Sequence, residues 1–98
     1  MMRILSLDDF ARHVGESFAV TVNGSDVVFA LVQAEPLPVR PHSLAARVPF
    51  SLIFRNTAPV IFPQQIYSAT HAALGTIGIF LVPVARDAEG FLYQAVYN

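Results

Sequence analysis

Residues 74–84 read LGTIGIFLVPV, and after a short polar turn residues 91–97 read FLYQAVY. β-branched and aromatic residues dominate both arms, which is typical of β-strands. Asp87 and Gly90 provide the polar, conformationally permissive residues of a turn between the arms. The first arm is apolar on both faces, so we expect it to be covered on both sides, by the rest of the chain or by a second copy. Pro83 cannot donate a ladder hydrogen bond and is therefore expected at a strand end, a bulge or a sheet edge.

The N-terminal region predicts one short helix over about residues 7–14. Ser6 is a favourable N-cap residue, and Asp9 three positions later provides a variant of the capping box. The apolar residues fall at helical spacing on one face, and Gly15 ends the pattern; they are Leu7, Phe10, Ala11 and Val14. The charges complement the helix dipole and suggest two pairs, Asp8 with Arg12 and Asp9 with His13. We expect this helix to cover an open end or face of the sheet.

Elsewhere the periodicity is that of β-strands. Alternating apolar residues bounded by turn residues predict strands at residues 17–22, 26–35, 50–55 and 65–71, before the two arms of the hairpin. Three prolines between residues 36 and 47 predict a flexible proline-rich loop. The chain, residues 1–98, is therefore expected to be a single, mainly β domain. The expected fold is a six-stranded antiparallel meander forming a small barrel or two-layer sandwich, with one short N-terminal helix.

The composition constrains the class of protein. Hydrophobic residues make up 54% of the chain and charged residues 13%, compared with about 25% charged in an average domain. All six basic residues are arginine, the net charge is −1, and no basic stripe suggests binding to nucleic acid or to a membrane. Cysteine is absent, which excludes disulfides and thiolate chemistry. The first residues lack the pattern of a signal peptide, so a cytoplasmic location is expected.

No catalytic or cofactor motif is visible. His13, His42 and His71 lack the close spacing of zinc motifs, so we expect neither a metal site nor a cofactor. The chain has no nucleophile elbow and no phosphate-binding glycine loop, and we expect it not to be an enzyme. Tyr67 shares a strand face with His71, which permits either a hydrogen-bonded pair or simple packing.

Positive charge gathers in one region of the sequence. The residues are Arg40, His42, Arg47 and Arg55. They permit two interpretations: a contact with an anion or an acidic partner, or a solvated loop whose arginines keep an apolar chain soluble.

Several segments resemble an uncharacterised bacterial family of small domains of unknown function. The segments that carry the resemblance are residues 5–10, Val14-Gly15, Phe18, residues 49–54, Tyr67, His71, Leu74-Gly75, residues 80–84 and residues 93–98. The resemblance spans nearly the whole chain, and none of its motifs is specific to a chemistry. The resemblance therefore implies no catalytic residues for this chain.

The surplus of apolar surface over charge favours a non-catalytic interaction or structural module that self-associates or binds another protein. A homo-oligomer is expected, most simply a dimer, with interface residues among Ile77, Ile79, Phe80, Tyr93 and Tyr97. Two alternatives remain open. The barrel could hold a small apolar ligand, although side chains such as Phe29, Phe54 and Phe80 are expected to fill it, or the chain could be an accessory subunit of a phage-tail-like assembly.

Overall fold

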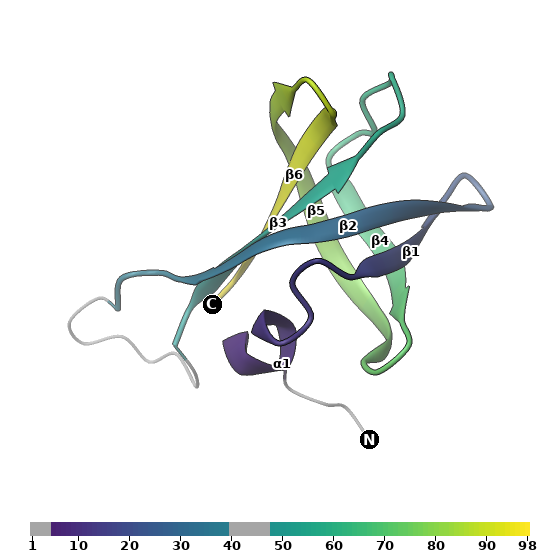
Figure 1. The fold of residues 1–98 in the computed structure, drawn as a ribbon. Coiled ribbons are helices and arrows are strands. Elements are labelled where there is room, and N and C mark those ends of the chain that lie inside the picture. Colours follow the sequence, from purple (N-terminus) through teal and green to yellow (C-terminus); the bar gives the residue numbers. More distant parts are fainter. Residues whose placement is uncertain (1–4, 40–47) are drawn as a thin grey trace.

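The computed structural model describes residues 5–39 and 48–98. Within these residues one short helix precedes six strands (Figure 1). The elements are α1 (Leu7–Ala11), β1 (Ser17–Val22), β2 (Ser25–Pro36), β3 (Phe50–Asn56), β4 (Gln65–His71), β5 (Gly75–Asp87) and β6 (Gly90–Tyr97). The expected strands are confirmed, and the longest of them, β2 and β5, extend beyond their predicted ends.

The six strands close into a barrel in the order β1-β2-β3-β6-β5-β4, and every neighbouring pair is antiparallel. Each half of the chain forms a three-stranded meander, and β3 pairs with β6 instead of with β4. The register of β5 against β6 shifts just after Pro83, so of the three expected positions, a strand end, a bulge or a sheet edge, the residue lies at a bulge. The antiparallel barrel predicted from the sequence is thus confirmed, and it is closed.

The tight turns follow from their residues. Asn23 and Gly24 both have positive φ, 50° and 82°, and join β1 to β2 through a two-residue turn that matches the twist of the strands. Gly90 begins β6 against the end of β3. A side chain at Gly90 would collide with the carbonyl oxygen of Asn56, so only glycine allows this close approach.

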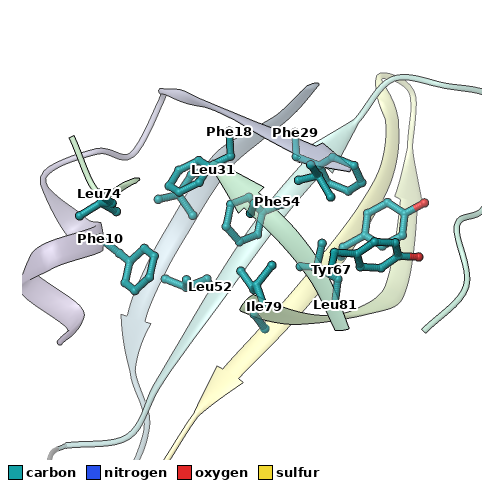
Figure 2. Close-up of a cluster of buried hydrophobic side chains, with 14 of the residues drawn as sticks. Phe10, Phe18, Phe29, Leu31, Leu52, Phe54, Tyr67, Leu74, Ile79 and Leu81 are labelled. Carbon is teal, nitrogen blue, oxygen red and sulfur yellow. The ribbon is translucent and has the colours of Figure 1, made fainter. Parts of the chain in front are cut away.

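Aromatic and aliphatic side chains fill the barrel from end to end (Figure 2). The largest fully buried side chains are those of Tyr93, Phe10, Phe18, Phe29, Phe50, Phe54, Leu31, Leu52, Ile79, Leu81 and Val20. Close packing of this kind leaves the interior of a six-stranded barrel occupied by its own residues. Phe29 and Phe54 lie inside as expected, whereas Phe80 lies on the outer surface.

One end of the barrel, called here the helix end, is covered by α1 (Figure 1). Phe10 of α1 is fully buried, and its ring lies 6.5 Å from Phe18, 5.8 Å from Phe50 and 5.7 Å from Tyr97. These three residues stand at the start of β1, the start of β3 and the end of β6. The helix therefore closes an open barrel end, as the apolar stripe predicts.

The helix is shorter than predicted. It ends at Ala11, and Val14, expected on its apolar face, is 44% exposed. The chain leaves the helical path because Gly15 adopts a φ of 95° and donates its N–H to Leu31 of β2. Arg12 bonds the backbone oxygen of Asp8, and His13 bonds Glu16 instead of the expected Asp9. The carboxylate of Asp9 accepts the N–H of Ser6, in keeping with the predicted cap.

The opposite end, called here the loop end, is covered by the connection between β3 and β4. Phe62 of this connection lies half-buried over Phe29 and Tyr93, with ring centroids 6.0 and 6.3 Å away. The backbone N–H of Phe62 donates to the hydroxyl of Tyr93 at 2.9 Å. The hydroxyl of Tyr67 donates to the carbonyl oxygen of Pro63. Figure 2 shows Phe10 and Phe29 at opposite ends of the packed interior.

Within this chain the first arm of the hairpin is covered on one face only: Ile79 and Leu81 are buried, whereas Phe80 between them is 46% exposed. Cover of the other face by a second copy stays a prediction. The barrel has a single interior, so alternate residues of every strand must face outward. The proline-rich loop predicted at 36–47 falls largely on residues 40–47, which lie outside the described residues, as do Arg40, His42 and Arg47.

Candidate functional site

An uncharged surface with two large apolar side chains covers the outside of two neighbouring strands. Ile66 of β4 lies directly opposite Phe80 of β5, and the two side chains are 74% and 46% exposed. Along the same face Ser68 pairs with Gly78, and Thr70 with Thr76. We call these six residues the β4–β5 outer face. A closed barrel has no free strand edge, so side chains such as these are what it offers to a partner.

The β4–β5 outer face carries no charge, but charged residues lie near the turn between β5 and β6. Arg55 of β3 pairs with Asp87 at 2.7 Å and with Glu89 at 3.2 Å, beside the turn between β5 and β6. The hydrogen bond from Arg55 lowers the pKa of Asp87 below its ordinary value, and the same bond raises the pKa of Arg55. Of the four residues expected to contact an anion, Arg55 is the one that the structure describes. Its guanidinium binds two carboxylates of this chain, and a contact of Arg55 with an outside anion stays a prediction.

The structure separates the expected interface residues. Phe80 lies on the β4–β5 outer face, whereas Ile79 and Tyr93 point into the barrel and are at most 2% exposed. Ile77 and Tyr97 are partly buried against the core. The interface expectation is therefore corrected for Ile79 and Tyr93, because a residue that fills the barrel cannot contact a partner while the barrel is intact. Ile66, which the sequence analysis did not select, is the most exposed large apolar residue among those that the structure describes.

A second candidate lies at the helix end, where two histidines meet one carboxylate. His71 ends β4, while His13 and Glu16 lie in the segment between α1 and β1. Oxygen Oε1 of Glu16 lies 2.8 Å from Nε2 of His71 and 3.0 Å from Nδ1 of His13. The His71 side chain is 3% exposed, that of His13 15% and that of Glu16 50%. We call these three residues the His–Glu–His cluster.

Further contacts hold His71 in place. Its Nδ1 accepts the backbone N–H of Ala73 at 3.0 Å and that of Leu74 at 3.3 Å. Its ring packs against Phe18 at 4.6 Å and against His13 at 4.4 Å between centroids. The hydrogen bond to His71, followed by that to His13, lowers the pKa of Glu16 below its ordinary value. The carboxylate is therefore held in its ionised form.

From the sequence, His13 and His71 were considered together only as possible metal ligands, and Glu16 was missed. The two histidines are far apart in the chain, and the pairing of β1 with β4, Ala19 opposite Thr70, brings them together. No local signal marks such a pairing, because a β-barrel joins strands that are distant in sequence. Tyr67 and His71 share the inner face of β4, as expected, but their hydrogen-bond partners lie at opposite ends of the barrel. These two residues therefore do not form a common site.

Comparison with known proteins gives one family. The family described as Domain of unknown function (DUF6916) matches residues 5–97. No curated protein and no solved structure matches the chain. None of the described residues forms a helix that is long and apolar enough to cross a membrane.

Proposed function

The chain belongs to this family of domains of unknown function, and we propose that it is a non-catalytic interaction module that forms a homodimer through the β4–β5 outer face. The observation that carries the proposal is the exposed, directly paired Ile66 and Phe80 on a face without charge. Depletion of charge and the presence of large apolar or aromatic side chains distinguish the centre of protein interfaces from ordinary surface.

The shape of the face favours a second copy as the partner. Ile66 and Phe80 form a ridge, and beside it Ser68 and Gly78 form a flat strip with only small side chains. A two-fold axis would place the ridge of one copy on the strip of the other, which is the self-complementarity that an isologous dimer requires. Because neither surface carries charge, the two copies would meet without like-charge repulsion.

The β4–β5 outer face is poorly suited to binding other classes of partner. It has no arginine or lysine to neutralise phosphates, which is the main source of affinity for nucleic acid. The alternative of an apolar ligand inside the barrel has less support, because aromatic side chains occupy the interior. The alternative of a phage-tail-like assembly has no particular residue in its favour.

Sedimentation equilibrium of the purified chain at high micromolar concentration tests the proposal. We expect a particle of about twice the chain mass of 10.7 kDa. Ile66→Lys should return it to the monomer, because a buried, unpaired ammonium is strongly unfavourable in an interface.

Val28→Lys is the matched control. Val28 is also an exposed β-branched residue, 62% exposed, but it lies on β2, which is three strands away from β5 in the closed order. This variant should remain a dimer. A wild-type particle of 10.7 kDa throughout the concentration range would contradict the proposal, and so would equal dissociation of both variants.

A further inference from the structure

In the His–Glu–His cluster, the protonation of one nitrogen, Nδ1 of His71, follows from its backbone neighbours. Backbone N–H groups can only donate, and two of them, from Ala73 and Leu74, point at Nδ1 of His71. Nδ1 must therefore carry a lone pair. In a neutral imidazole the proton then lies on Nε2, and this N–H donates to Oε1 of Glu16 at 2.8 Å.

The same reasoning extends from Glu16 to His13. An ionised carboxylate only accepts hydrogen bonds, so Nδ1 of His13, 3.0 Å from the same oxygen, must be the donor. The remaining nitrogen of a neutral His13, Nε2, then carries a lone pair. In the described part of the chain no hydrogen-bond partner is found for it, and the His13 side chain is partly exposed.

We propose that His13 Nε2 is a base presented at the helix end, and that Glu16 and His71 are positioning residues that set its tautomer. The site would accept a hydrogen bond or a proton from a small ligand that carries a hydroxyl or ammonium group. The arrangement follows the logic by which a carboxylate bound to one ring nitrogen prepares the other nitrogen as a general base. This inference is independent of the proposed dimer.

The geometry argues for this arrangement over a metal centre. Potential ligand atoms of the three residues lie within 4.8 Å of one another, which alone would suit a divalent ion. A histidine that binds a metal through Nε2, however, normally donates its Nδ1–H to an acceptor. Nδ1 of His71 instead faces two donors. If Nε2 bound a metal, the proton of the neutral ring would lie on Nδ1, and this N–H would point at the N–H groups of Ala73 and Leu74.

Long-range ¹H–¹⁵N NMR of the histidine rings tests the proposal directly, because it distinguishes protonated from unprotonated ring nitrogens. At a pH where the rings are neutral we expect Nε2–H for His71 and Nδ1–H for His13. Glu16→Ala should return His13 to a mixture of tautomers and leave His71 unchanged, since the backbone still holds it. Glu89→Ala, at the loop end, is the control and should change neither ring.

Carbethoxylation by diethyl pyrocarbonate gives a second readout. The unprotonated nitrogen attacks a carbonyl carbon, an N–C bond forms, and the C–O bond to ethyl carbonate breaks. The ring loses the proton of its other nitrogen, and the ethyl carbonate takes up one proton and decomposes to ethanol and carbon dioxide. Peptide mass mapping should find the label on His13 and not on His71. Nδ1–H on His71, preferential labelling of His71, or stoichiometric Zn²⁺ shifting both rings together would each overturn the proposal.

Discussion

The two ends of the barrel are closed in the same way but held by different polar groups. At both ends a phenylalanine from outside the sheet packs on buried aromatic rings, Phe10 at the helix end and Phe62 at the loop end. Phe10 is fully buried, whereas Phe62 is half-buried. The helix end adds the ionisable His–Glu–His cluster, and the loop end adds the hydroxyls of Tyr67 and Tyr93 bonded to the backbone.

This difference shows that apolar packing and hydrogen bonding by polar groups make separate contributions to closing a small barrel. The depth of the covering ring should decide how much each end contributes to stability. The chemistry of the polar groups should decide the pH range in which each end weakens.

The largest effect is expected from removing the covering rings. Phe10→Ala should lower the free energy of unfolding by about 3–5 kcal/mol, because a fully buried ring leaves a cavity. Phe62→Ala, the matched variant at the loop end, should cost about 1–2 kcal/mol because less surface is buried. Urea denaturation measures both. A loss below about 1 kcal/mol for Phe10→Ala would mean that α1 is not docked on the barrel.

A smaller effect is expected from the Tyr93 hydroxyl at the loop end. Tyr93→Phe keeps the ring but leaves the N–H of Phe62 without its acceptor, which should cost about 1 kcal/mol. Amide hydrogen exchange should become faster at Phe62. The amide of Leu37, bonded to Pro49 and remote from this ring, serves as the internal control. Unchanged exchange at Phe62 would show that the hydroxyl does not hold the connection.

The loop end should weaken in alkali through Tyr67. Burial is the main cause that raises the pKa of Tyr67 above its ordinary value of 10.0, and the neutral hydroxyl is the form that donates to Pro63. The stabilisation from this group is therefore complete below the pKa of an unfolded tyrosine and is lost as pH rises through the higher folded value. The free energy of unfolding should fall more steeply above about pH 10 in the wild type than in Tyr67→Phe. Equal slopes would contradict this assignment.

The smallest effect is expected in acid, at the helix end. The pKa of Glu16 is lowered from 4.5 by its hydrogen bonds to His71 and His13, so its stabilisation is present above the pKa of an unfolded glutamate. It is lost as pH falls through the lower folded value. Thermal unfolding below about pH 4.3 should therefore show a steeper loss in the wild type than in Glu16→Gln. Tyr67→Phe, altered only at the other end, should keep the wild-type acid slope.

The sequence by itself determined the elements and the orientation of their side chains. Alternation placed Tyr67 and His71 on one face of β4, which the structure shows to be the inner face, and Ser6 with Asp9 marked the start of the helix. These features depend on residues a few positions apart, which local backbone geometry relates directly. The match to a family of domains of unknown function agrees with the resemblance found in the sequence.

Only the tertiary structure decided which strands meet and therefore which side chains share a site. The pairing of β3 with β6 and of β1 with β4 closes the barrel, leaves Phe80 outside, and carries Asp87 to Arg55. It also brings His71 to Glu16, 55 positions apart in the chain. Contacts of that separation depend on the whole sheet forming at once, because no local periodicity relates the two residues.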